Sequence, residues 1–191
     1  FCRIKETKNS VMRAFPAIAI FFFTLLFAAC ETARPSANPG GDDGLIEVVF
    51  LQLNDVYEIS PMPSDNSGGL ARVATVRKEL LGKNPNVITV LAGDFISPSV
   101  IGTLKYEGKR IRGKHMVETL NTLGLDWVVF GNHEFDYDDQ ADLQARLDES
   151  KFSWLGANVR MKNADGSQST FYKNVNGTKL NCADNVVYTL R

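Results

Sequence analysis

The chain has 191 residues, of which 44% are hydrophobic and 23% charged, and its formal net charge is −1. This composition is ordinary for a globular protein and supplies enough apolar side chains for one domain with a packed core. The residues after position 30 are mildly acidic, which argues against a nucleic-acid-binding surface, because such a surface needs clustered Lys and Arg. The cysteines match no zinc-site spacing and no disulfide framework: Cys2, Cys30 and Cys182.

Residues 1–30 have the features of a bacterial export signal. They hold four basic side chains and one acidic one, followed by an uncharged apolar run over residues 17–29 that is shorter than the about 20 residues of a membrane span. Residues 27–30 (Phe-Ala-Ala-Cys) resemble a lipoprotein cleavage box, with Phe where Leu is usual. We expect a start at Met12, lipid attached to Cys30, and a membrane-anchored protein in the periplasm or at the cell surface. An uncleaved anchor or a buried apolar segment is the alternative.

The remainder divides into a tether and a folded domain. Residues 31–44 contain two prolines and three glycines and predict a flexible tether. From residue 45 onward, buried-strand and amphipathic-helix patterns alternate. Strands are predicted over residues 46–53, 87–92, 127–130 and 152–157. Helices are predicted over residues 69–82, 112–124 and 138–149. Alternation of this kind indicates an α/β fold with parallel strands and right-handed helical crossovers.

Two of these helices have an apolar stripe that should face the sheet. In the first helix the stripe consists of Leu70, Val73, Val76 and Leu80. In the second it consists of Met116, Val117, Leu120 and Leu123.

Polar side chains follow all four predicted strands. In chain order they belong to Asn54-Asp55-Val56-Tyr57, Gly93-Asp94, Gly131-Asn132-His133-Glu134-Phe135-Asp136 and Asn158. The carboxyl ends of parallel strands meet at one edge of a sheet, where ligands bind. Carboxylate and amide oxygens suit hard or borderline divalent cations, and glycines leave room for the backbone to turn close to an ion. Any one of these residues alone is a turn former or helix cap, but together they predict a metal site.

The longer motifs resemble those of calcineurin-like metallophosphoesterases, and in particular the branch of 5′-nucleotidases and 2′,3′-cyclic phosphodiesterases. The similarity runs from about residue 46 to residue 160. Four stretches carry it: Leu51-Gln52-Leu53-Asn54-Asp55, Gly68-Gly69-Leu70-Ala71-Arg72, Ala92-Gly93-Asp94-Phe95 and Gly131-Asn132-His133-Glu134-Phe135-Asp136. The resemblance implies the metallophosphoesterase sheet with flanking helices and two divalent metal ions, drawn from Zn, Mn, Mg, Co or Fe.

The resemblance also implies roles for individual residues. Asp55 would bind the first metal, Asp94 would bridge both, and Asn132 would bind the second. His133 would lie beside the phosphoryl group, and Asp136 would orient it. Two ions about 3.5–4 Å apart would acidify a bound water and hold the phosphoryl oxygens.

Two further residues near the predicted ligands are not assigned to metal binding or catalysis. Glu134 is expected to hold its loop together rather than to act on substrate. Asn158 could support the metal ligands or simply end its strand.

Two features depart from the family pattern. The family usually has Asp-x-His after the first strand, whereas this chain has Tyr57 at the third position, where it could bind metal or donate a hydrogen bond. The family also supplies further histidines downstream, but the chain has only His133 and His115. His115 lies on a predicted helix beside Lys114, where a solvated or partly packed position is expected.

The C-terminal part suggests an incomplete domain. Residues 161–170 are polar and loop-like, residues 171–175 could be an edge strand, and residues 180–191 lack the pattern of a further buried strand. We therefore expect residues 45–191 to be a truncated metallophosphoesterase domain. The expected function is hydrolysis of a nucleotide, with cyclic phosphodiesters and sugar phosphates as alternative substrates. A domain that is anchored at the surface, binds metal weakly and catalyses nothing is the alternative from another class.

Overall fold

The structure, a computed structural model, describes residues 44–190. The predicted signal and nearly all of the tether lie outside the described residues. Within them, no helix is both long enough and apolar enough to cross a membrane. The residues from Leu45 onward form one compact unit.

The centre of this unit is a four-stranded parallel sheet in the order β1-β2-β5-β6. Its strands are β1 (Val49–Leu53), β2 (Val87–Leu91), β5 (Trp127–Val129) and β6 (Ser153–Leu155). All four lie within the predicted ranges, and each is shorter than predicted. The parallel α/β arrangement is therefore confirmed.

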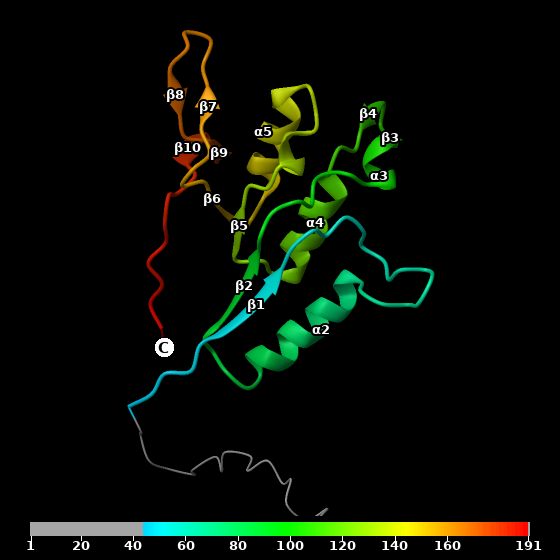
Figure 1. Cartoon of the computed structure of the whole chain (residues 1–191), viewed down its shortest axis with the longest axis vertical. Coiled ribbons are helices and arrows are strands. Elements are labelled where there is room, and N and C mark those ends of the chain that lie inside the picture. The colour runs from blue at the N-terminus through cyan, green and yellow to red at the C-terminus, as the bar shows by residue number, and fades with distance from the viewer. Residues whose placement is uncertain (1–43, 191) are drawn as a thin grey trace, which may run out of the picture. The chain divides into compact units, whose positions relative to one another are not determined.

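Three helices connect these strands: α2 (Leu70–Leu81), α4 (Lys114–Leu123) and α5 (Gln140–Glu149). Helix α4 contacts both α2 and α5, and Figure 1 shows the three helices along one side of the sheet. The N-cap of α5 is Asp139, whose carboxylate accepts a hydrogen bond of 2.9 Å from the Ala141 N–H. Such a cap satisfies a backbone donor that would otherwise lack a partner.

The core lies between the sheet and these helices. Leu91, Val128 and Trp154 are paired in register across three strands and are buried. The inward stripe predicted for α4 is confirmed, because all four of its apolar residues are buried. The stripe predicted for α2 is wrong at Val76, which is 46% exposed, because α2 buries only its first residue, Leu70, fully.

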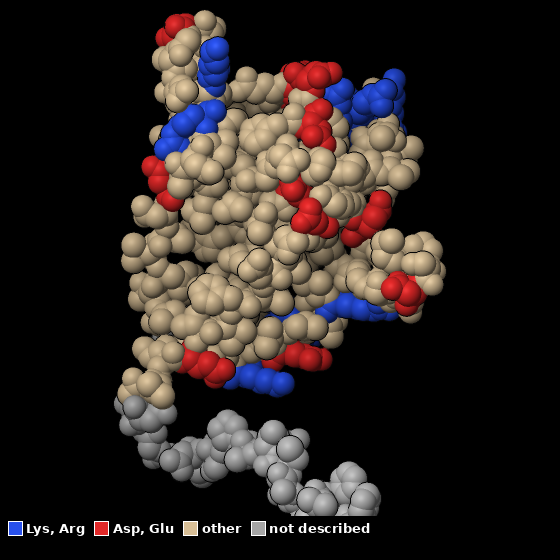
Figure 2. All heavy atoms as spheres, viewed as in Figure 1, with Lys and Arg blue, Asp and Glu red and all other residues tan. Residues whose placement is uncertain are grey.

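Side chains of the sheet that point away from the helices are more exposed to solvent than those that face them. Phe50 on β1 is 67% exposed and Val129 on β5 is 39% exposed. In Figure 2 acidic side chains extend from the upper margin to the right of the centre of the visible face, whereas the area left of and below the centre has few charged side chains.

Short elements that the sequence did not predict surround the sheet. Helix α3 (Val100–Thr103) leads into a hairpin of β3 (Lys105–Tyr106) and β4 (Lys109–Arg110). A second hairpin pairs β7 (Met161–Lys162) with β8 (Gln168–Ser169). Residues 161–170, expected to form a loop, therefore contain two short strands joined by a turn.

The possible edge strand at residues 171–175 exists as β9 (Tyr172–Val175), but it pairs with β10 (Thr178–Asn181) and not with the main sheet. All four residues of β10 are exposed, so it is not a buried strand. Beyond it, Ala183 forms one parallel bridge with Leu155 of β6, through two backbone hydrogen bonds of 2.9 and 3.2 Å. The edge of β6 is therefore paired at a single point.

Candidate functional site

The predicted site residues lie in loops at the carboxyl ends of β1, β2 and β5. Asp55 and Asp94 have positive φ angles of 53° and 60°, a conformation that is uncommon for residues other than glycine. This conformation turns the chain sharply out of each strand. The Asp55 N–H donates to the Gly93 carbonyl at 3.3 Å, which joins the first two loops.

Two glycines allow the second and third loops to approach each other. A Cβ on Gly93 would lie 2.5 Å from the Gly131 nitrogen. A Cβ on Gly131 would overlap the Asp94 carboxylate and lie 2.8 Å from the Asp94 nitrogen. The Asp94 carboxylate therefore lies directly against the main chain at Gly131, and its Oδ1 accepts a hydrogen bond of 2.8 Å from the His133 N–H. Asp94 and the His133 loop are thus in direct contact.

Asp55 is exposed, and both of its carboxylate oxygens accept hydrogen bonds. The Asn54 amide donates to Oδ2 at 2.8 Å and the Tyr57 hydroxyl donates to Oδ1 at 2.7 Å. These two bonds, Asn54 first, lower the pKa of the Asp55 carboxyl below its usual value. The same bond to Asp55 raises the pKa of Tyr57 to about 12. The phenol is thus held in its protonated form and acts here as a hydrogen-bond donor to Asp55.

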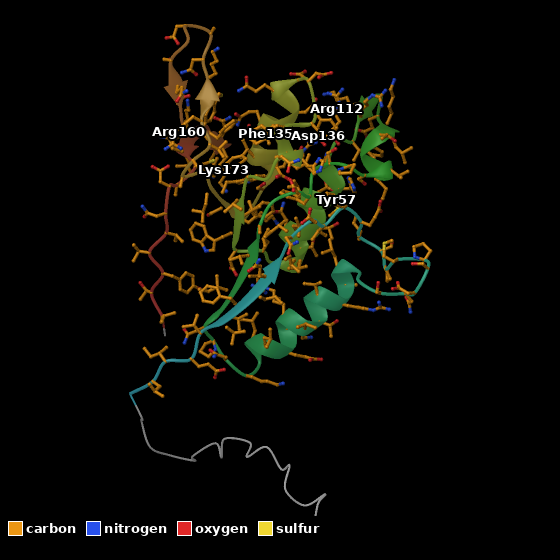
Figure 3. The ribbon with its side chains drawn as sticks, viewed as in Figure 1. Tyr57, Arg112, Phe135, Asp136, Arg160 and Lys173 are labelled. Atoms are coloured by element: carbon orange, nitrogen blue, oxygen red, sulfur yellow. The ribbon has the colours of Figure 1, made fainter. Side chains whose placement is uncertain are left out.

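His133 and Asp136 belong to one short turn, the 3₁₀ helix η1 (His133–Phe135) and the residue that follows it. The His133 Nδ1 lies 2.7 Å from the Asp136 Oδ2. This hydrogen bond raises the pKa of His133. The Tyr57 ring meets the His133 ring edge-on, with 5.8 Å between centroids, and Figure 3 shows Tyr57 and Asp136 at the same end of the sheet. The turn therefore holds the imidazole with Nε2 as its free nitrogen.

Ser97 is a contributor that the sequence did not reveal. It is buried and forms a hydrogen bond with the Asp136 side chain. Burial acts to raise the pKa of Asp136, but hydrogen bonds with His133 and Ser97 outweigh it, so the pKa is lowered. Ser97 lies three residues after Asp94 in an unpatterned loop, so only the folded structure could identify it.

The remaining predicted residues have different surroundings. Glu134 is buried and turned inward, as expected of a residue that holds its loop together. Asn132 and Asn158 are exposed, and their side chains form no hydrogen bond within residues 44–190. The Asn132 amide is therefore available to a ligand, whereas no contact connects Asn158 to the site.

The oxygen ligands at this edge of the sheet are of the type that a hard divalent cation prefers, but the set is incomplete. Two carboxylates and one amide oxygen are available, from Asp55, Asp94 and Asn132. Because Gly131 has no side chain, the Asp94 carboxylate can lie directly against its backbone. In the described part of the chain, however, no three His, Cys, Asp or Glu residues are placed to hold one ion. The residues present could thus contribute ligands without completing a two-metal site.

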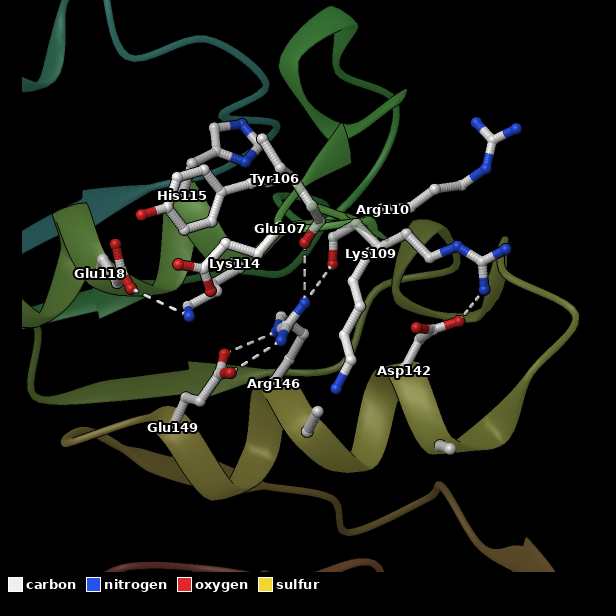
Figure 4. Close-up of a pocket in the computed structure, with 14 residues that line it drawn as sticks. Tyr106, Glu107, Lys109, Arg110, Lys114, His115, Glu118, Asp142, Arg146 and Glu149 are labelled. Carbon is white, nitrogen blue, oxygen red and sulfur yellow. Dashed lines mark hydrogen bonds and ion pairs between the residues drawn. The ribbon is translucent and has the colours of Figure 1, made fainter. Parts of the chain in front are cut away.

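A groove of about 1110 Å³ lies elsewhere, between the β3–β4 hairpin and helices α4 and α5. Figure 4 shows that several of its charged side chains pair with one another, as Arg146 does with Glu149. His115 lines this groove with its Nε2 3.1 Å from the Ser99 hydroxyl. Within residues 44–190 its Nδ1 has no hydrogen-bond partner, and burial lowers the pKa of His115. His115 is thus partly packed, as expected, and contacts none of the site residues.

Comparison with known proteins identifies the family of this chain. Residues 48–188 match the family described as calcineurin-like phosphoesterase. The chain is 30% identical over 155 residues to 5′-nucleotidase from Homo sapiens, covering 76% of this chain and 25% of that protein. It is 32% identical over 138 residues to snake venom 5′-nucleotidase from Gloydius brevicauda, covering 68% and 22%. The chain thus spans about a quarter of the length of these curated relatives.

A solved structure, the NAD nucleotidase of Haemophilus influenzae, shares the fold. Its TM-score is 0.50 and its sequence is 21% identical, with 70% of this chain and 25% of that chain covered. The family match extends over most of the described residues and includes all three site loops. This chain therefore belongs to the calcineurin-like phosphoesterase family.

Proposed function

We propose that this chain carries part of the active site of a metal-dependent phosphoester hydrolase that acts on nucleotides. One observation supports this most strongly: Asp94 and His133 are in contact although 39 residues separate them, and His133 is at the same time paired with Asp136. A carboxylate beside an oriented imidazole is an arrangement suited to phosphoryl transfer.

In this proposal Asp55 and Asn132 would each help to hold one divalent ion, and Asp94 would contribute to holding both. Bound divalent ions supply positive charge for the phosphoryl oxygens and lower the pKa of a water molecule. His133 provides a proton at Nε2 for the departing oxygen, because Nδ1 is engaged by Asp136 and the raised pKa favours the protonated ring. Tyr57 acts as a donor to Asp55 in the absence of metal.

The nucleotide substrate is proposed from the relatives, two of which are 5′-nucleotidases. Phosphate release from AMP by the full chain, with Mn²⁺ or Zn²⁺ added, tests the proposal. Compared with the unmodified chain, His133→Ala should slow release about 100-fold or more, the usual range for a lost acid–base group, while Mn²⁺ binding persists. Release that is equally fast in both chains would reject the role of His133. Parallel assays with 2′,3′-cyclic AMP and a sugar phosphate distinguish the substrate classes.

A domain that binds metal only weakly and catalyses nothing is the second candidate. It is favoured by the lack of three acidic, His or Cys residues placed to hold one ion in the part of the chain that the structure describes. Mn²⁺ binding with no phosphate release from any of these esters would support this candidate.

Export and lipid attachment are proposed from residues 1–30 alone. If Cys30 carries the lipid, the chain expressed in bacteria should incorporate radioactive palmitate, and Cys30→Ser should not. Labelling that persists in Cys30→Ser would exclude this attachment site.

A further inference from the structure

Glu134 has an unusual set of contacts for a carboxylate next to a catalytic site. It is only 1% exposed, and every hydrogen bond that it accepts within residues 44–190 comes from a backbone N–H group. Its Oε2 accepts from Gly131 at 2.6 Å and from Asp94 at 2.9 Å. Its Oε1 accepts from Phe95 at 2.9 Å and from Ile96 at 3.4 Å. In the part of the chain that the structure describes, the Glu134 carboxylate thus accepts hydrogen bonds from the backbone and from no side chain.

These donors come from two loops. Asp94, Phe95 and Ile96 follow β2, whereas Gly131 follows β5, so one carboxylate joins segments that lie about 40 residues apart in the chain. Buried N–H groups need acceptors, and bonds to a carboxylate are stronger than bonds between neutral groups. A single carboxylate therefore accepts hydrogen bonds from both loops.

The joined residues are those that carry the site. Asp94 donates its backbone N–H to Glu134, while its carboxylate accepts the N–H of His133, the residue next to Glu134 in the sequence. Movement of either loop would therefore change the placement of the Asp94 carboxylate relative to the imidazole. The Asp136 side chain, which bonds to His133 and to Ser97, is a second link between the two loops.

We propose that Glu134 is a positioning residue, which sets the separation between Asp94 and the Asn132-His133 segment before metal or substrate binds. The effect of Glu134 on catalysis rests on the proposed hydrolase function. The effect of Glu134 on loop structure does not, and the two effects can be measured separately.

The test compares Glu134→Gln with a matched control, Asp126→Asn, in the full chain without metal. Gln has the same shape as Glu, but its amide nitrogen cannot accept a hydrogen bond, so donors on one side lose their acceptor. Asp126 also links the same two strands, away from the site: it directly precedes β5, and its Oδ2 accepts from the N–H of Thr89 in the middle of β2 at 2.8 Å. Both substitutions thus remove one carboxylate that links β2 and β5, and only one of them lies at the site.

The main readout is hydrogen exchange of the His133 amide, which bonds to Asp94 and not to Glu134. We expect exchange at His133 to be about tenfold faster or more in E134Q and nearly unchanged in D126N, given the strength of bonds to charged groups. Mn²⁺ affinity should fall in E134Q and stay the same in D126N. An unchanged His133 rate in E134Q, or equal acceleration in both variants, overturns the proposal.

Two further measurements cover the other outcomes. If E134Q does not fold, Glu134→Asp replaces it, because the shorter carboxylate cannot reach both loops, and the same change at His133 is expected. If the unmodified chain binds no Mn²⁺, the hydrolase proposal fails, while the exchange rates still decide whether Glu134 positions the loops.

Discussion

The backbone N–H of His133 donates a hydrogen bond of 2.8 Å to the Oδ1 of Asp94. The same residue engages Asp136 through its ring at 2.7 Å, so His133 contacts two carboxylates with two different groups. The main-chain bond places the loop and the ring bond orients the imidazole. One short turn after β5 can therefore both orient the His133 imidazole and provide a backbone donor to Asp94.

Gly131→Ala should disturb Asp94 directly. The added Cβ would overlap the Asp94 carboxylate, and the nearby backbone nitrogen of Asp94 leaves little room for relief. We expect a loss of about 1–3 kcal/mol in the free energy of unfolding, as for other overpacked sites, together with weaker Mn²⁺ binding. Urea denaturation and metal titration measure the two effects.

Gly82→Ala is the control for this substitution. Its backbone is helical, with φ of −70°, and a Cβ there would lie 3.5 Å from the nearest atom, an ordinary contact. Stability should change by no more than about 0.5 kcal/mol, with no loss of metal binding. Equal effects of the two substitutions would contradict the close approach of Gly131 to Asp94.

Tyr57→His should strengthen metal binding. Tyr57 is a poor ligand here because its hydroxyl donates to Asp55 and its pKa is raised to about 12. An imidazole at this position offers a neutral nitrogen that suits Zn²⁺, and we expect affinity to increase about tenfold, the lower end of effects seen around metal sites. Calorimetric titration with Zn²⁺ measures this change.

Tyr57→Phe separates the donor role from the ligand role. It removes the hydroxyl and keeps the ring, so Zn²⁺ affinity should not fall, and the pKa of Asp55 should rise toward its usual value. A marked loss of Zn²⁺ binding in this variant would show that the phenol is a ligand.

The pairing of His133 with Asp136 predicts a specific pH dependence in the metal-free chain. The hydrogen bond raises the pKa of His133 above its ordinary value of 6.5. The pair therefore stabilises the fold fully below pH 6.5, and this contribution disappears as the pH rises through the raised pKa. NMR titration of the imidazole should show a midpoint above 6.5 that falls toward it in Asp136→Asn. Asp138→Asn, at an exposed neighbour, should leave the midpoint unchanged, and a shift there would argue against pairing as the cause.

The main sheet and helices were predictable because their signals are local. Helix α2 is bounded by Gly69 and Gly82, and buried strands such as β2 are continuous apolar runs. The hairpins were missed because two-residue strands show no periodicity. The turn at Asn176-Gly177, with φ of 50° and 79°, is nevertheless a familiar hairpin signal that could have placed β9 against β10.

The sequence could predict which loops would form the site, but not the contacts between individual side chains. Strand-end motifs indicated that Asp55, Asp94 and His133 would share one edge, and the backbone contacts between these loops agree. The bond from Tyr57 to Asp55 was one of two options that the sequence left open. The contacts of Glu134 and Ser97 depend on donors and acceptors that lie about 40 residues away, so no local pattern could reveal them.

The central claim is that Asp55, Asp94 and Asn132 form one cation-binding edge. The most direct test is paramagnetic broadening by Mn²⁺ of the amide signals in the isotopically labelled full chain. The account predicts that signals from the three loops after β1, β2 and β5 broaden first and together, and that Asp94→Asn abolishes the effect. Broadening that begins at other carboxylates, such as Asp165, or that persists unchanged in Asp94→Asn, would contradict it.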